Sequence, residues 1–298
     1  MQWSTWLRSQ WKAQRHKTGG AKMPTYFAHI DDVTPENMDA GDGWLITEFR
    51  LPFSDRQGLG TTMFHARFNP GAVHKKHKHE NCEEIYYIVS GNGIAGAGGT
   101  TEEIGAGHFH HVPADTEHWL ANESDVEPIV VIGWYLGAGS VASTGYVYMG
   151  DVTEADFEGP HKGYDVGSLV NHTDVAPADM GKIDGWGGSE FRACLGVAQE
   201  IFHAASRAVY RPGESFKPHR YANANAYYMV VAGGGRAGVG DEVAAIRAGS
   251  CLHAPAGTIH WFESTGAEPL TMIGLQEGAG SLAAGGFEAA GEIPAAVD

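Results

Sequence analysis

The chain has 298 residues, enough for two ordinary domains, and its 43% hydrophobic against 19% charged residues allow each domain a buried core. Its formal net charge of −16 disfavours nucleic acid and anionic membranes as partners, because an acidic surface repels phosphate groups. The 42 glycines are about twice the usual share of roughly 7% and predict many tight turns.

Residues 1–28 are predicted to form an arm that precedes the first domain. This segment carries positive charges but no apolar stretch behind them, so it does not match a secretory signal. No apolar run in the sequence is long enough to cross a bilayer. Cys82, Cys194 and Cys251 show no disulfide spacing and are expected to be small buried residues in a reducing compartment. We therefore expect a cytoplasmic protein.

The two halves of the chain repeat each other. GWLITEFR (43–50) corresponds to GWGGSEFR (185–192) at an offset of 142 residues, and the same offset relates His77 to His219 and His118 to His260. One register that holds across most of a domain indicates two copies of one fold. We predict a first domain over 29–150, a linker over 151–170 and a second domain over 171–298.

Each half consists of short β-branched or aromatic runs separated by glycine turns. TTMFHARF (61–68), EEIYYIVSG (83–91) and PIVVIGWYL (128–136) have the length of strands. Closely spaced short strands favour a sandwich or a closed barrel, so the fold class is all-β. Helix is expected only as short pieces near Pro35–Ala40 and Pro177–Met180.

One constellation in the first half indicates a metal site. His77 and His79 are two residues apart, so on a strand both point to one face, and Glu84 follows after a short gap that fits a turn. His118 comes from a separate strand. Three imidazoles and one carboxylate suit Fe(II), Mn(II), Ni(II), Zn(II) or Cu(II), and four ligands leave an octahedral ion open to substrate.

These residues match both motifs of the cupin superfamily. Gly-x5-His-x-His-x4-Glu-x6-Gly is met by Gly71, His77, His79, Glu84 and Gly91. Gly-x5-Pro-x-Gly-x2-His-x3-Asn is met by Gly107, Pro113, His118 and Asn122, with Asp115 where the family usually has glycine. The chain thus resembles a bicupin. The resemblance implies two tandem jelly-roll β-barrels, with one divalent metal ion held in the N-terminal barrel by His77, His79, Glu84 and His118.

The second half has lost this ligand set. The positions that correspond to the four ligands hold His219, Tyr221, Ala226 and His260, so the carboxylate and one imidazole are missing. We expect no tight metal binding there. The C-terminal barrel is expected to support the first barrel, and the alternative is a metal-free pocket for a small ligand, lined by His219, Tyr221, Tyr228 and His260.

The resemblance implies a metal-dependent enzyme acting on a small oxygen-rich organic molecule that chelates the ion. An iron dioxygenase, with Fe(II), is the favoured class because oxygen chemistry is frequent among cupins with this ligand set. The first alternative is a lyase, isomerase or decarboxylase that uses Mn, Ni or Zn. The second is a non-catalytic binding or storage bicupin. Oxalate-decarboxylase-like bicupins usually keep ligands in both barrels, a pattern from which this chain departs.

Further expectations follow from strand parity. Because Glu84 faces the metal, Tyr86 should also face inward, as the candidate catalytic residue, and Tyr87 outward. His110 and His111 are either support for His118 or residues of a wet outer face. His74 lies in a lysine-rich run and is expected to be solvated. Exposed sheet edges and the arm make a homodimer the expected assembly.

Overall fold

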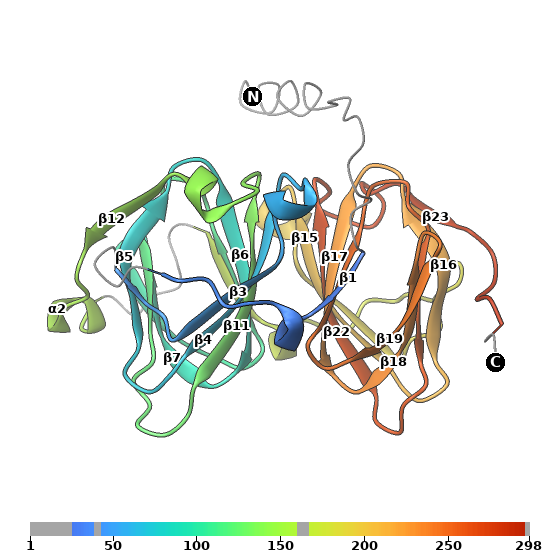
Figure 1. Cartoon of the computed structure of the whole chain (residues 1–298), viewed down its shortest axis with the longest axis horizontal. Coiled ribbons are helices and arrows are strands. Elements are labelled where there is room, and N and C mark those ends of the chain that lie inside the picture. Colours follow the sequence, from blue (N-terminus) through green and yellow to red (C-terminus); the bar gives the residue numbers. More distant parts are fainter. Residues whose placement is uncertain (1–25, 39–42, 160–166, 296–298) are drawn as a thin grey trace.

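The computed structural model describes residues 26–38, 43–159 and 167–295 of the chain. Two β-barrels lie side by side, with the N-terminal half of the chain on one side and the C-terminal half on the other (Figure 1). The two barrels agree with the tandem jelly-roll β-barrels predicted from the sequence. Most of residues 1–28, where an arm was predicted, and part of the predicted linker lie outside the described residues.

The N-terminal barrel is built from two facing antiparallel sheets. One has the strand order β13-β9-β6-β11-β4-β3, and the other has the order β12-β5-β10-β7-β8, with β2 paired to β5. The strands of this half are β2 (Trp44–Leu45), β3 (Glu48–Phe53), β4 (Thr62–Phe68), β5 (Val73–His79), β6 (Glu83–Ser90), β7 (Asn92–Ala97), β8 (Thr100–Gly105), β9 (His108–Val112), β10 (His118–Ala121), β11 (Ile129–Leu136) and β12 (Tyr146–Gly150).

The C-terminal barrel repeats this plan. Its sheets have the orders β1-β20-β17-β22-β15-β14 and β19-β18-β21-β16-β23. The strands of this half are β13 (Ser168–Asn171), β14 (Glu190–Leu195), β15 (Ala204–Tyr210), β16 (Ser215–Tyr221), β17 (Asn225–Ala232), β18 (Gly234–Val239), β19 (Glu242–Arg247), β20 (Ser250–Ala254), β21 (His260–Ser264), β22 (Leu270–Glu277) and β23 (Phe287–Ala289).

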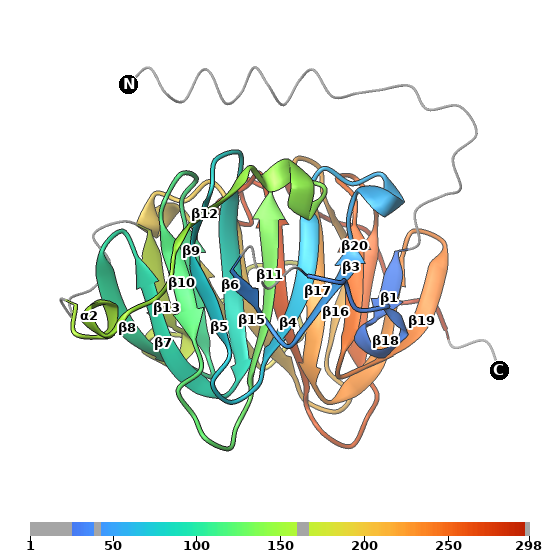
Figure 2. The ribbon, with the colours of Figure 1, turned by 60° about the vertical axis from the view of Figure 1, so that its left-hand side comes forward.

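The two halves exchange one strand each. β1 (Phe27–His29), which precedes the N-terminal barrel in sequence, pairs antiparallel with β20 of the C-terminal barrel. In return β13, which opens the second half, pairs with β9 of the N-terminal barrel. Figure 2 shows β1 on the side of the C-terminal barrel, near β18 and β19. The exchange crosses the domain boundaries predicted from the sequence.

Helix is scarce, but it does not lie where it was expected. The described residues of 35–40 and all of 177–180 contain no helix. Short 3₁₀ helices occur just before these segments, at Ile30–Asp32 and His172–Asp174. The side chains of His29 and Asn171 cap them by accepting hydrogen bonds from the backbone N–H groups of Asp31 and Thr173. Other 3₁₀ turns span Asp55–Gln57, Val141–Thr144 and Val197–Gln199, and α2 spans Glu154–Phe157.

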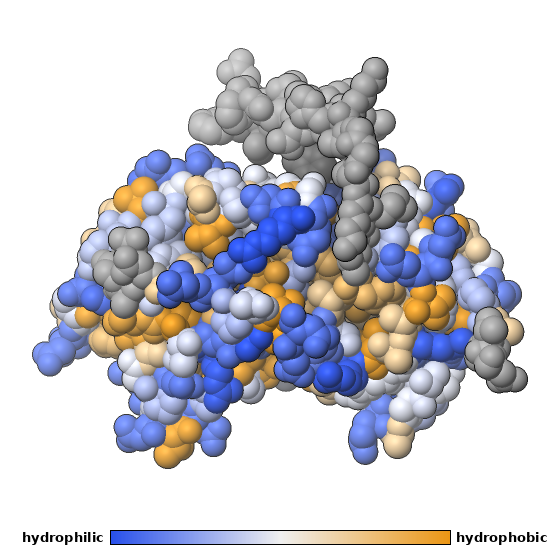
Figure 3. Space-filling view, in the orientation of Figure 1, coloured by the Kyte–Doolittle hydropathy of each residue, from blue (hydrophilic) through white to orange (hydrophobic). Residues whose placement is uncertain are grey.

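In each barrel, the sheet that packs against the other barrel is buried on both faces. In β6, Tyr86 and Ile88 face the interior of the N-terminal barrel, whereas Ile85 and Tyr87 join a core cluster shared by the two barrels. Tyr87 therefore points out of its own barrel, as predicted, but is only 5% exposed. The barrels are packed as one body, and Figure 3 shows hydrophilic residues over most of one face of it, interrupted by hydrophobic patches.

The shared core also contains a buried carboxyl group. Glu277 of β22 is 3% exposed and accepts hydrogen bonds from Asn225 of its own barrel (2.9 Å) and from the Thr61 hydroxyl of the other. Burial raises the pKa of Glu277 above its usual value, although these two hydrogen bonds act in the opposite direction. A polar contact thus links the barrels inside an apolar interface.

The structure confirms that the three cysteines are buried and accounts for Asp115 at the family's usual glycine position. All three cysteines are free and buried, Cys194 and Cys251 within the shared core. Asp115, which replaces the family's usual glycine, has a φ of 61°. Glycine is favoured in this left-handed conformation because it has no Cβ, and aspartate is among the few other residues that tolerate it.

A candidate metal centre in the N-terminal barrel

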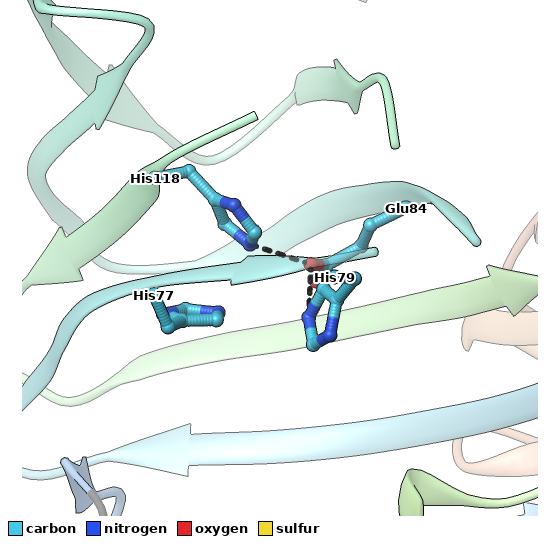
Figure 4. A group of neighbouring side chains, drawn as sticks. All are labelled: His77, His79, Glu84 and His118. Atoms are coloured by element: carbon cyan, nitrogen blue, oxygen red, sulfur yellow. Dashed lines mark hydrogen bonds and ion pairs between the residues drawn. The ribbon is translucent and has the colours of Figure 1, made fainter. Parts of the chain in front are cut away.

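The four predicted ligands converge inside the N-terminal barrel. His77 and His79 lie on β5, Glu84 on β6 and His118 on β10. One ligand atom from each lies within 4.8 Å of all the others. The Nε2 atom of His118 is 3.0 Å from Glu84 Oε2, and the Nε2 atom of His79 is 3.4 Å from the same oxygen (Figure 4). No second group of this kind occurs in the described part of the chain.

Backbone carbonyls orient two of the imidazoles. The Nδ1 atom of His77 lies 2.7 Å from the Lys75 carbonyl oxygen, and that of His118 lies 2.9 Å from the Thr116 carbonyl oxygen. A carbonyl can only accept, so Nδ1 carries the proton in both rings, and the Nε2 atom of each ring is directed toward the cluster. The same arrangement commonly fixes metal-binding histidines in the tautomer that binds the ion.

The burial of these groups is costly without a cation. The four side chains are between 1% and 7% exposed. Within the described ranges, His77 Nε2 and His79 Nδ1 are buried without a hydrogen-bond partner. Native proteins rarely leave such atoms unsatisfied. Burial lowers the pKa of His77 well below its usual value, so the ring is neutral and able to coordinate. The residues present therefore fit a divalent metal ion.

Glu84 supplies the negative charge of the cluster. Burial alone would raise the pKa of this carboxyl, but hydrogen bonds from His118 and His79 outweigh it and lower the pKa below the usual value. Glu84 is consequently ionised across the physiological range. With a divalent cation bound, the three imidazoles would be neutral and the one carboxylate would offset half of the charge of the ion, so the remaining charge could attract an anionic substrate.

His74 was expected to be solvated, and this expectation is wrong. Its side chain is buried, its ring stacks on His77 with centroids 3.7 Å apart, and it lines the same cavity. The reason is a bulge in β5: His118 of β10 pairs with His77, but Leu120, two residues later, pairs with His74, three residues earlier. The extra residue brings His74 to the inner face, which simple alternation does not predict.

Tyr86 faces inward as predicted. It is 5% exposed and lines the cavity together with His77, Glu84 and His118. Its hydroxyl lies 2.5 Å from Nδ1 of His110, which is fully buried. Burial lowers the pKa of His110 to about 3. His110 thus supports Tyr86 through a hydrogen bond, a role that the alternating strand pattern alone does not reveal.

His111, Trp134 and Tyr135 lie outside the ligand cluster. His111 is buried, with its Nε2 atom 2.8 Å from Glu83, so the wet outer face considered for it is not observed. Trp134 belongs to the core shared by the barrels, whereas Tyr135 lines the cavity. The cavity is small, with a volume of about 30 Å³.

The comparisons agree with this architecture. The family model described as "Cupin domain" matches residues 64–135 and 206–275, once in each half of the chain. The chain therefore belongs to the cupin superfamily and is a two-barrel member of it. None of the curated proteins compared matches the sequence significantly.

Solved structures of Bacillus subtilis oxalate decarboxylase share the fold. One, from a study of the Mn(II) centres of that enzyme, has a TM-score of 0.67 at 14% sequence identity and covers 88% of this chain and 79% of its own. Another, of the enzyme at pH 4.6, has a TM-score of 0.66 at 14% identity over 88% and 78%. At such low identity the likeness concerns the fold.

In the described ranges, no helix is long and apolar enough to cross a membrane. The predicted homodimer and the predicted cytoplasmic location stay predictions.

Proposed function

We propose that the N-terminal barrel binds one divalent metal ion through His77, His79, Glu84 and His118 and decarboxylates a small carboxylic acid. The convergence of the four ligand atoms within 4.8 Å inside a closed barrel carries this proposal. Mn(II) is the favoured ion, because the solved structures that share the fold belong to a decarboxylase studied for its Mn(II) centres. The comparisons do not support the iron dioxygenase predicted from the sequence.

A carboxylate group of a small substrate would bind through the metal ion, because the described cavity wall itself offers no cation. Apart from the cluster and its neighbours, its walls are apolar, with Phe49, Phe64 and Val131 among the lining residues. No lysine or arginine is among the described residues that line it. When bound, the ion would act as a Lewis acid that polarises the carboxylate and a neighbouring oxygen of the substrate.

Tyr86 is the residue that we assign to proton transfer. In decarboxylation the bond between the carboxylate carbon and its neighbour breaks, carbon dioxide leaves, and the electron pair remains on the other carbon. That carbon must then take up one proton. The Tyr86 hydroxyl faces the cavity, and His110 is within hydrogen-bond distance to orient it and return a proton. The apolar walls exclude water that would compete for this step.

The proposal is tested by metal analysis and by a paired gas assay. Protein purified without chelators is expected to contain about one Mn per chain. The loaded protein is then incubated with oxalate and with other small 2-oxo and 2-hydroxy acids, while release of carbon dioxide and uptake of oxygen are recorded together. We expect carbon dioxide release without stoichiometric oxygen uptake, and none from Glu84→Gln protein.

Two outcomes would overturn the proposal. Stoichiometric oxygen consumption with iron in the site would restore the dioxygenase interpretation. Ligand binding that persists in Glu84→Gln protein, with no turnover of any acid by the metal-loaded wild type, would indicate a non-catalytic bicupin.

A further inference from the structure

His74 is a buried polar side chain in the chamber of the metal cluster, and it is not one of the four ligands. It is 8% exposed and lines the cavity together with His77, Glu84 and His118. Its Nε2 atom is buried and has no hydrogen-bond partner among the described residues. Native proteins rarely leave such an atom unsatisfied. An unsatisfied polar atom of a residue that lines a binding cavity indicates a contact with the molecule that binds there.

Packing alone does not require an imidazole at this position. The His74 ring stacks on His77 with centroids 3.7 Å apart and contacts the Trp44 ring at 4.4 Å. The corresponding residue of the second barrel is Phe216, which stacks on His219 at the same 3.7 Å and lines the cavity of that barrel. A phenyl ring therefore fulfils the packing role in the barrel that has lost the ligand set. The nitrogen atoms are found in the barrel that has kept it.

The charges of the metal centre favour a substrate with a single negative charge. A divalent ion together with the carboxylate of Glu84 leaves one net positive charge, which a monoanion neutralises. A dianion would leave one negative charge buried, and no lysine or arginine is among the described residues that line the cavity. A proton on His74 could offset that charge only on a ring stacked against His77, where the bound ion repels it.

We propose that the metal centre selects a small monocarboxylic acid with a hydroxyl or keto group beside the carboxylate, in preference to a dicarboxylate, and that His74 Nε2 hydrogen-bonds an oxygen of this acid. The carboxylate supplies the single negative charge, and the neighbouring oxygen is neutral. A neutral imidazole adds a directed contact without adding charge. This inference rests on the metal site of the proposed function and adds the charge class of its substrate.

The test is calorimetric titration of the full chain, loaded with Mn(II) and checked by elemental analysis, with glycolate and with oxalate near neutral pH. Both ligands have two carbons, which suits a small cavity, but glycolate is singly and oxalate doubly charged. Free Mn(II) in the same buffer is the reference, because it attracts the doubly charged ligand more strongly. We expect one glycolate per chain, bound at least about tenfold more tightly than oxalate.

Two results of this titration overturn the inference. One is oxalate binding that is as tight as glycolate binding or tighter. The other is the absence of glycolate binding at millimolar concentration by protein that contains its metal.

Variants test the role of His74. His74→Phe introduces the residue of the second barrel, so Mn content should stay near one per chain while glycolate affinity falls at least about tenfold. His74→Gln keeps an N–H donor and should hold glycolate within about threefold of the wild type. Phe216→His, the matched control, should leave glycolate affinity unchanged. Unaltered affinity in folded His74→Phe protein overturns the assignment. If thermal melting shows that this variant does not fold, His74→Leu replaces it, with the same expected loss.

These results separate the inference from the proposed function. A chain that binds no metal overturns both. A metal-loaded chain that prefers oxalate and releases carbon dioxide overturns the inference alone. Selective glycolate binding that depends on His74, without decarboxylation of any acid, supports the inference and overturns the proposed reaction.

Discussion

The two barrels share one scaffold but have opposite interiors. In both barrels a bulged strand brings a second ring onto a buried histidine. His74 stacks on His77 in the first barrel and Phe216 stacks on His219 in the second, each with ring centroids 3.7 Å apart. The first interior holds a carboxylate within an imidazole cluster, whereas no carboxylate is among the described residues that line the second. A few side chains on a retained backbone therefore decide whether a barrel of this chain contains a cluster of possible metal ligands.

Removing the carboxylate should make the first barrel resemble the second. Glu84→Gln keeps the size of the side chain but removes the anionic ligand, so we expect metal content to fall from about one equivalent to near zero and decarboxylase activity to fall at least about 100-fold. Elemental analysis and the gas assay measure the two effects. The matched control is His260→Gln in the second barrel, which should retain the metal. Full metal content in Glu84→Gln protein would contradict the ligand assignment.

The paired tyrosines provide a second comparison. Tyr86→Phe removes the hydroxyl assigned to proton transfer, so kcat should fall about 100-fold while metal content and KM stay nearly unchanged. Tyr228→Phe, at the corresponding position of the second barrel, should leave kcat unaltered. Steady-state kinetics with a pH profile of kcat separate the roles. A variant that loses thermal stability but keeps kcat would show that Tyr86 only packs.

The converse experiment builds the missing site. Tyr221→His combined with Ala226→Glu restores the ligand set of the second barrel around His219 and His260, and we expect metal content to rise from about one to about two equivalents per chain. Elemental analysis after loading with Mn measures the change. Either single substitution serves as a control and should add little metal. A folded double variant that still holds one equivalent would show that more than the ligand set separates the barrels.

The smallest expected effect concerns the interface between the barrels. Since the folded-state pKa of Glu277 is raised above its ordinary value of 4.5, its contribution to stability is full below that pH and is lost as pH rises through the folded pKa. Glu277→Gln should remove this loss and raise the free energy of unfolding at pH 8 by about 1 kcal/mol relative to wild type, with little change at pH 4.

Thermal or denaturant unfolding at both pH values measures this effect, with the exposed Glu242→Gln as control. An equal difference between Glu277→Gln and wild type at the two pH values would contradict the pKa assignment.

The sequence predicted the architecture and the metal cluster because both depend on spacing along strands. The offset of 142 residues indicated the repeat, and the two-residue spacing of His77 and His79 placed both rings on one face. His74 was misplaced because a bulge cannot be read from alternation, and the shared core was not foreseen because inward and outward residues of β6 are both apolar. The contact between Tyr86 and His110 joins two strands and requires the fold.

The exchange of strands has a consequence for how the molecule is made. The first described residues complete a sheet with β20, whose strand begins at Ser250, so ribosomal synthesis must pass that point before β1 has its partner. Closing so long a loop is slow compared with forming neighbouring hairpins. Separation of the two halves after a cut between them would remove β1 from β20 and β13 from β9. The exposed sheet edges could then pair with other molecules. The two halves of this chain are therefore expected to fold as a single unit, although each forms its own barrel.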